Sequence, residues 1–197
     1  MFGHIPGQEI IDLIDGIVGN VREYMAQVGF WIDAVQFVTG SRPSFMTDNF
    51  DTENLAYLGV SEVIVFDVRG QAQASVAPEG EDSLREVAGD RVADLRPLAM
   101  SLLAAGDIKQ VMKTLRVADG RLELVAASVV HDPDDPNARG RGALMMVRFF
   151  DAKELARLSE VLMTTTRLSL NEIGHSGADT HVVRTDADQD EMYAVLK

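Results

Sequence analysis

The residue patterns that support catalysis in other proteins are absent or incomplete in this chain. The run Gly174-His175-Ser176-Gly177-Ala178 places a serine between glycines, but an exposed nucleophilic serine needs glycine where Ala178 stands. No phosphate-binding glycine-rich run occurs, and without cysteine there is no thiolate nucleophile. The sequence therefore predicts no catalytic residue and no enzyme activity. A hydrolase using paired carboxylates remains an alternative, because any set of 31 acidic residues contains pairs.

The acidic runs and the histidines do not form a recognisable metal site. Asp186, Asp188 and Asp190 alternate as calcium ligands do, but Glu191 occupies the position where such a loop needs glycine. The run at 132–135 is interrupted by proline. The histidines are scattered, none of them paired at helical spacing: His4, His131, His175 and His181. We expect solvated loops here, and no metal or other cofactor.

Composition places the chain among soluble acidic domains. Its 197 residues carry 31 acidic and 18 basic side chains, a formal charge of −13, with a pI near 4.6. A nucleic-acid binder needs a basic patch, so we expect no nucleic-acid partner. No run of about 18 apolar residues occurs, and the first residues do not resemble a signal peptide. Either the protein is soluble, or this is a soluble piece of a longer chain.

Residues 8–38 have the pattern of one long amphipathic helix. Apolar or aromatic side chains recur there at alternating spacings of four and three, which places them on one stripe of a helix. The stripe consists of Ile10, Ile14, Ile17, Val21, Tyr24, Val28, Trp31 and Val35. Such a stripe suits either packing against the chain's own core or pairing with a second copy.

Two hairpins follow, and they predict an antiparallel sheet. An irregular segment at 41–50 and a short helix at 53–58, capped by Asp51 or Thr52, precede them. Residues 81–106 are helical in character, and residues 151–163 form an amphipathic helix. Strands are expected at 62–67, 71–76, 110–117, 121–130, 142–149 and 164–170, with a last hairpin of 181–185 and 192–196. The fold class is α+β, a single domain over 1–197 with a five- or six-stranded sheet in residues 59–197.

Two stretches of the chain together resemble a known family. The first is GFWIDAVQFV at 29–38, followed by Phe45, Asn49, Asn54 and Leu55, and then GVSEVIVFDVRG at 59–70. The second is GALMMVRFFDAKELARLSEVL at 142–162. Their order and spacing resemble the CHASE domain of the fourth type, an extracytoplasmic sensor module of bacterial signalling receptors, over roughly residues 22–170.

The resemblance implies a fold, a location and a role. Such domains look like the PAS-related Cache fold and usually lie between two transmembrane helices, upstream of diguanylate cyclase, phosphodiesterase or histidine-kinase modules. The implied role is to bind an unknown small molecule in the periplasm and to signal by rearrangement of the long helix, in a homodimer formed through that helix. Membrane attachment would come only from flanking segments absent here. A stand-alone PAS-like binding protein is the alternative.

Five residues are candidate ligand contacts: Trp31, Asp33, Tyr57, His131 and Arg148. Trp31, the only tryptophan, could stack on a ligand or pack at the junction of helix and sheet. Asp33 could bind a polar ligand group or pair with an arginine. Arg148 lies in an apolar strand, where a charge must pair or face water, so it could bind an anionic ligand or bridge to an acid such as Asp33.

Overall fold

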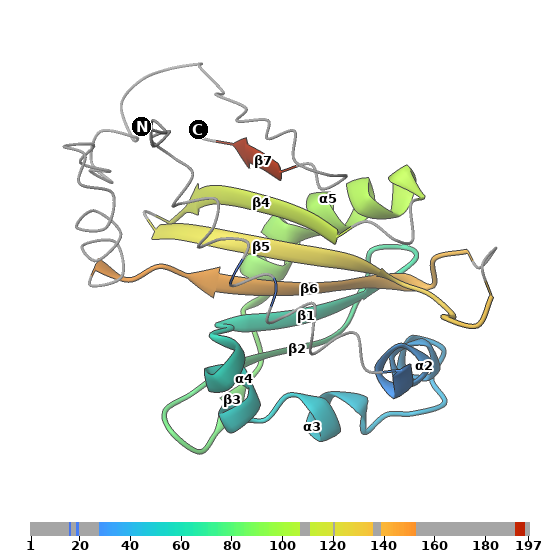
Figure 1. Ribbon diagram of the computed structural model, residues 1–197. Helices are drawn as coiled ribbons and strands as arrows, with labels where there is room; N and C mark the ends of the chain where they lie inside the picture. Colours follow the sequence, from blue (N-terminus) through green and yellow to red (C-terminus); the bar gives the residue numbers. More distant parts are fainter. Residues whose placement is uncertain are drawn as a thin grey trace, which may run out of the picture.

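One mixed sheet organises the protein (Figure 1). The computed structural model describes residues 16, 19, 28–106, 111–119, 121–135, 139–152 and 192–195. The strand order in the sheet is β3-β2-β1-β6-β5-β4-β7. All neighbours are antiparallel except β7, which runs parallel to β4. The strands are β1 (Glu62–Asp67), β2 (Ala72–Pro78), β3 (Leu84–Arg85), β4 (Val111–Ala118), β5 (Arg121–Val130), β6 (Gly142–Phe149) and β7 (Met192–Val195).

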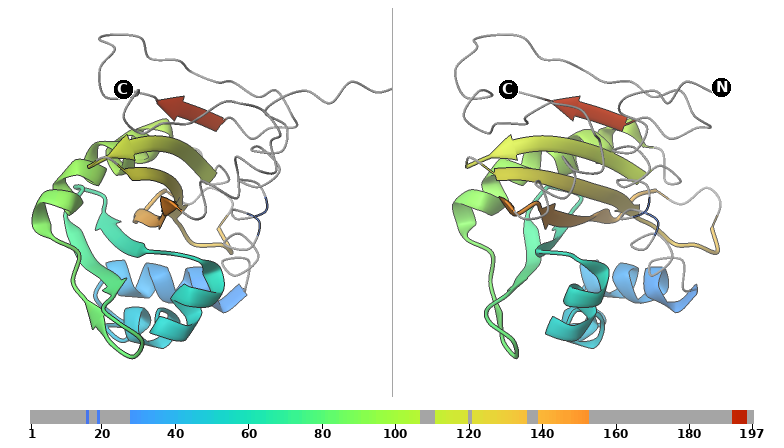
Figure 2. Two further views of the ribbon diagram at one scale, coloured as in Figure 1. Left: turned by 90° about the vertical axis from the view of Figure 1, so that its left-hand side faces the viewer. Right: turned by 60° about the vertical axis from the view of Figure 1, so that its left-hand side comes forward.

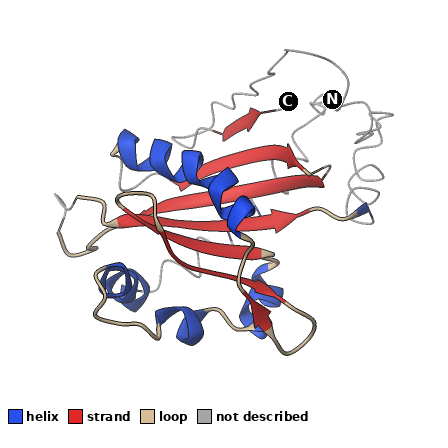
Figure 3. Ribbon diagram, turned by 180° about the vertical axis from the view of Figure 1, so that it is seen from behind, coloured by secondary structure: helices blue, strands red, loops and turns tan. Residues whose placement is uncertain are grey.

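Helices cover both faces of this sheet (Figure 2). Before the first strand come α2 (Val28–Val38), α3 (Phe45–Asn49) and α4 (Thr52–Leu58), all on one face. Helix α5 (Gly89–Ala105) connects β3 to β4 and crosses the opposite face, which is in front in Figure 3. The central strands are therefore buried on two sides, and this explains why β1 is a nearly continuous apolar run.

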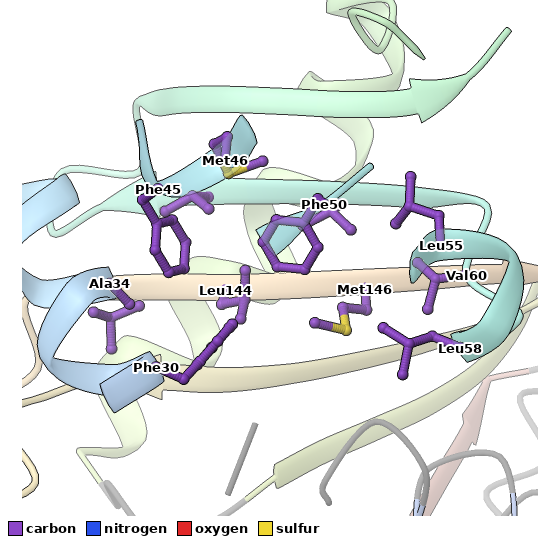
Figure 4. Close-up of a cluster of buried hydrophobic side chains, with 13 residues drawn as sticks. Phe30, Ala34, Phe45, Met46, Phe50, Leu55, Leu58, Val60, Leu144 and Met146 are labelled. Atoms are coloured by element: carbon purple, nitrogen blue, oxygen red, sulfur yellow. The ribbon is translucent and has the colours of Figure 1, made fainter. Parts of the chain in front are cut away.

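The face under α2, α3 and α4 is filled by aliphatic side chains, methionines and three phenylalanines, a cluster that we call the aromatic core (Figure 4). Phe30 contacts Phe45 and Phe50 edge-on, with ring centroids 5.3 and 6.1 Å apart. Phe45 and Phe50 are fully buried. Leu144 and Met146 of β6 close this core from the sheet side. Large rings packed edge to face leave little room for a ligand on this face.

The predicted α+β class is confirmed, and strands β1 to β6 form the predicted antiparallel sheet, to which β7 is added in parallel. The two hairpins lie where the sequence places them, and the turn between β4 and β5 has Asp119 at φ +51°. Asp51 caps α4, as predicted, by accepting a hydrogen bond from the Asn54 backbone N–H at 2.7 Å. Local patterns were sufficient for these elements because their contacts span few residues.

Two local predictions are wrong. The segment expected to be irregular contains α3, whose Phe45 and Met46 are drawn into the core. The helix expected over 81–106 begins only at Gly89, because Leu84–Arg85 pair with β2 as β3. Burial of Leu84 against the aromatic core favours the strand.

The long N-terminal helix is described only in part. Its last third is α2, and Gly16 and Gly19 are also helical. The other residues of 8–27 lie outside the described part of the chain. So do the predicted helix after Ala152 and the predicted strands at 164–170 and 181–185. The strand predicted at 192–196 is β7, whose described partner is β4.

Candidate functional site

The α5 face of the sheet is apolar along most of its length and charged at one end. Residues that alternate along a strand share a face. Glu62 therefore lies on the same face as Ile64, and Glu123 on the same face as Val125. Both glutamates are almost completely buried, with 4% and 1% of their surface exposed. Buried carboxylates require partners.

Two arginines supply those partners. Arg91 of α5 donates from Nε to Glu62 Oε2 at 2.9 Å and from Nη2 to Glu123 Oε2 at 2.5 Å. Arg116 of β4 donates from Nε to the other oxygen of Glu123 at 2.5 Å. Both arginines also bind Asp94 of α5, Arg91 through Nη1 at 3.0 Å and Arg116 through Nη2. We call Glu62, Arg91, Asp94, Arg116 and Glu123 the charged cluster.

The secondary structure places each member of the charged cluster. Arg116 and Glu123 face each other directly in the register of β4 and β5. Arg91 and Asp94 are separated by three positions in the first turns of α5, so they lie on one side of that helix. The helix is anchored further along by the buried Leu95 and by the other buried residues that follow it.

Burial and pairing act in opposite directions on the acids and bases of the charged cluster. Burial raises the pKa of Glu62 above its ordinary value, and the hydrogen bond from Arg91 only partly offsets that rise. Burial alone would lower the pKa of Arg91, but its hydrogen bonds to Glu123 and Glu62 raise it overall. Arg91 therefore stays charged, whereas burial disfavours the ionised form of Glu62.

The charged cluster borders a groove of about 660 Å³ between the first turns of α5 and the ends of β4 and β5. Two further arginines line it, Arg85 and Arg121, and both are exposed. Arg121 lies over the ring of Phe149, 4.3 Å from its centroid. Arg85 donates to the Glu86 carbonyl at 3.3 Å. Within the described ranges, neither of these guanidinium groups forms an ion pair.

The groove offers binding groups of both signs. Asp90 and Asp119 also line it, and both are exposed. Thr114 adds a hydroxyl, while Leu98 and Val117 add apolar surface. Such a mixture suits a small polar or charged molecule. Among the described residues, no group of three metal-binding side chains occurs.

The fold brings together Trp31 of α2 and His131, which follows β5. Their ring centroids are 5.5 Å apart with an interplanar angle of 33°. Both side chains are half-buried, and Trp31 packs against the aromatic core. The Nδ1 of His131 lies 3.0 Å from the Val129 carbonyl oxygen. These rings therefore have protein contacts of their own.

The other three candidates each have surroundings of their own. Asp33 pairs with Arg42, whose Nη1 lies 2.5 Å from Oδ1. Tyr57 is on α4 with 81% of its surface exposed. Arg148 donates to the Gly59 carbonyl at 3.4 Å and lies 5.9 Å from the ring centroid of Phe150. None of the five candidates lines the groove, and their role as ligand contacts stays a prediction.

Sequence reasoning missed the charged cluster, although part of its signal was present. Glu123 is an acidic residue at an inward position of a buried strand, and the Asp119-Gly120 turn sets its register with Arg116. That register would have paired the two residues. Arg91 could not be assigned in this way, since it joins Glu62 across 29 positions of sequence.

Comparison with known proteins identifies the family. The model of the CHASE4 domain matches residues 18–169, which is most of the chain. No curated protein matches the chain. Among the described helices, none has the length and apolar character needed to cross a membrane. The two motif stretches singled out in the sequence lie inside the matched region. The chain therefore belongs to the CHASE4 family of sensor domains of signalling receptors.

Proposed function

We propose that this chain is the extracytoplasmic ligand-sensing domain of a transmembrane bacterial signalling protein. The observation that carries the proposal is the groove beside the charged cluster, in a chain from a sensor-domain family. The groove lies between a helix and the sheet, where a bound molecule touches both. A PAS- or Cache-like relationship, a periplasmic location and an output module with cyclase, phosphodiesterase or kinase activity belong to this proposal.

Signalling would follow from the position of the groove. Arg91 and Asp94 belong to α5, whereas Arg116 and Glu123 belong to the sheet. A ligand that binds one arrangement of α5 and the sheet more tightly than another shifts the population toward it. Small shifts of a packed helix are a common form of such a transition.

A homodimer through the N-terminal helix would carry the signal onward. Among the side chains of α2 whose burial the structure describes, those of Phe30 and Ala34 are buried and face the aromatic core. Trp31, Ile32 and Val35 remain half-buried, and Trp31 and Val35 belong to the apolar stripe. Both also pack against the chain's own aromatic core, so only the part of their surface that stays exposed is available to a second copy in the proposed dimer.

Membership of a sensor-domain family is compatible with a chain that is not an enzyme. Glu62 is the buried carboxylate that lines the groove, and it is bound to Arg91. A carboxylate held in that way is a poor general base, so the hydrolase alternative gains no support from it. A stand-alone binding protein would use the same groove.

A thermal-shift screen of metabolites tests the proposal. Each stabilising compound is retested on the double variant Arg85→Gln/Arg121→Gln and, as a matched comparison, on Arg148→Ala. We expect the groove variant to lose the shift and Arg148→Ala to retain it. A shift that is lost only in Arg148→Ala would move the site to the other face. A library without any stabilising compound would count against ligand sensing by this domain.

A further inference from the structure

Asp94 is the exposed end of the charged cluster. Its side chain is 48% exposed, whereas those of Glu62 and Glu123 are 5% and 1% exposed. The same oxygen, Oδ2, accepts from Arg91 Nη1 at 3.0 Å and from Arg116 Nη2. The two guanidinium groups are thus held on one side by buried glutamates and on the groove side by a solvent-exposed carboxylate.

We propose that Asp94 is an internal place-holder, and that the groove takes a small molecule whose carboxylate displaces it from Arg116 and Arg91. This inference rests on the proposed sensing function. Guanidinium groups bind carboxylates through two parallel hydrogen bonds, so a ligand carboxylate can replace the one that leaves. The Asp94 carboxylate is half-exposed, so water can solvate it when it leaves, and the largely buried arginines keep their bonds to the buried glutamates.

The geometry limits this exchange to Asp94. Glu123 is enclosed and bound by both arginines, and Glu62 is bound to Arg91 at 2.9 Å. Asp90, the other acidic groove residue of α5, accepts from the Arg91 backbone N–H at 2.8 Å and does not touch either guanidinium group. Asp90 therefore places the same charge in the same groove without binding either guanidinium group.

Displacement of Asp94 would also change how α5 is held. The contact between Asp94 and Arg116 joins the helix to β4. When a ligand takes the place of Asp94, this direct bond between helix and sheet is lost, while the Arg91 bonds to Glu62 and Glu123 remain. The direct contact between α5 and β4 is thereby exchanged for a contact through the ligand, which exists only while the ligand is bound.

The test measures succinate binding to the whole chain by titration calorimetry at neutral pH. Asp94→Asn removes the competing charge while it preserves side-chain shape, and Asp90→Asn is the matched control. We expect the dissociation constant for succinate to fall about five- to tenfold in Asp94→Asn, the scale of one like charge removed near a partly exposed site. In Asp90→Asn it should change by less than about twofold. Succinamide, which lacks the charge, should show no gain.

Three results would overturn the inference. One is an equal gain in both variants, which would indicate a general charge effect. The second is a gain for succinamide as well, and the third is no succinate binding to Asp94→Asn at millimolar concentration. If an uncharged compound from the metabolite screen still depends on Arg85 and Arg121, the sensing function stands while the place-holder role fails. A melting temperature for each variant confirms that it is folded.

Discussion

Glu62 and Glu123 place two carboxylates on a face of the sheet that is otherwise apolar. Taking an ion out of water costs several kcal/mol, and attraction to a partner offsets that cost only when the geometry is good. Here Arg91 reaches both glutamates and Arg116 reaches the second. The buried part of the charged cluster thus balances the cost of burying ions against their mutual attraction. Removing one of its arginines should leave a buried glutamate without a partner that it needs.

The first prediction concerns Arg91. Arg91→Met keeps a side chain of similar length but leaves Glu62 without its hydrogen-bonded partner and Glu123 with only one. We expect the free energy of unfolding to fall by about 3–5 kcal/mol, the cost of breaking a buried ion pair. Urea denaturation measures it. Arg85→Met, an exposed arginine of the same groove, is the control and should cost less than about 1 kcal/mol. Equal losses in the two variants would contradict the central role of Arg91.

The second prediction concerns pH. Burial raises the pKa of Glu62 in the folded protein above 4.5, its ordinary value. Between these two pKa values the folded state holds a proton that the unfolded chain has released, so stability falls as pH rises through that interval. Glu62→Gln lacks this titration, and its stability relative to wild type should increase as pH rises from about 4.5.

Urea denaturation of both proteins across the acidic to neutral range checks this pH dependence. Glu53→Gln, at an exposed position of α4, controls for the loss of one carboxylate. If the free energy of unfolding of Glu62→Gln instead falls relative to that of wild type as pH rises, the pKa of Glu62 is lowered in the folded protein and not raised.

Single residues were predictable where the partner is near in sequence. The Asp51 cap, and a pairing of Asp33 with an arginine, could be stated from local pattern, and both occur. The ring contact of Trp31 with His131 and the bonds of Arg91 to Glu62 and Glu123 could not, because they join residues on different elements. The candidate site was missed for that reason.

At the scale of elements, the corner between α4 and β1 depends on Gly59. Gly59 has φ +65° at the end of α4, and its N–H donates to the Ala56 carbonyl at 3.1 Å. A Cβ at this position would collide with the guanidinium group of Arg148. The glycine thus serves both the left-handed helix end and the close approach of β6.

Gly59→Ala should therefore lower the free energy of unfolding by more than alanine usually does in a left-handed conformation. That conformation alone costs about 1 kcal/mol, and we expect about 2 kcal/mol in total. In an Arg148→Ala background the cost should return to about 1 kcal/mol, because the collision is gone. Gly106→Ala, at φ +70° with open space around it, is the control. If Gly59→Ala lowers the free energy of unfolding equally in the wild-type and Arg148→Ala backgrounds, a collision with Arg148 is not the cause.

Elements were predictable where pairing is local. The hairpins β1–β2 and β4–β5 follow from alternating residues around short turns. Helix α3 could not be foreseen because its burial depends on a residue of another element. Strand β3 pairs with the neighbouring strand β2 but is only two residues long, too short for an alternating pattern. Phe45 is held by Phe30, and Leu84 by β2 and the aromatic core.

At the scale of the whole molecule, the two faces of the sheet have different roles. One is filled by Phe30, Phe45 and Phe50, and the other ends in the groove. The chain carries a formal charge of −13, yet the groove is lined by four arginines and by only as many acidic side chains. Basic side chains gathered on an acidic protein locally offset its repulsion of anions. This contrast agrees with a groove that admits a carboxylate.

Self-association through the apolar stripe is the prediction for the assembled molecule. Ile14→Lys with Val21→Lys places two charges per protomer on the stripe. If the stripe forms a dimer seam, burial of unpaired lysines should raise the dissociation constant of the dimer about a hundredfold or more, as measured by sedimentation velocity. Gln8→Lys with Asn20→Lys adds the same charge outside the stripe and should leave association within about threefold of wild type. An unchanged sedimentation profile for the stripe variant, or equal weakening in both, would exclude the seam.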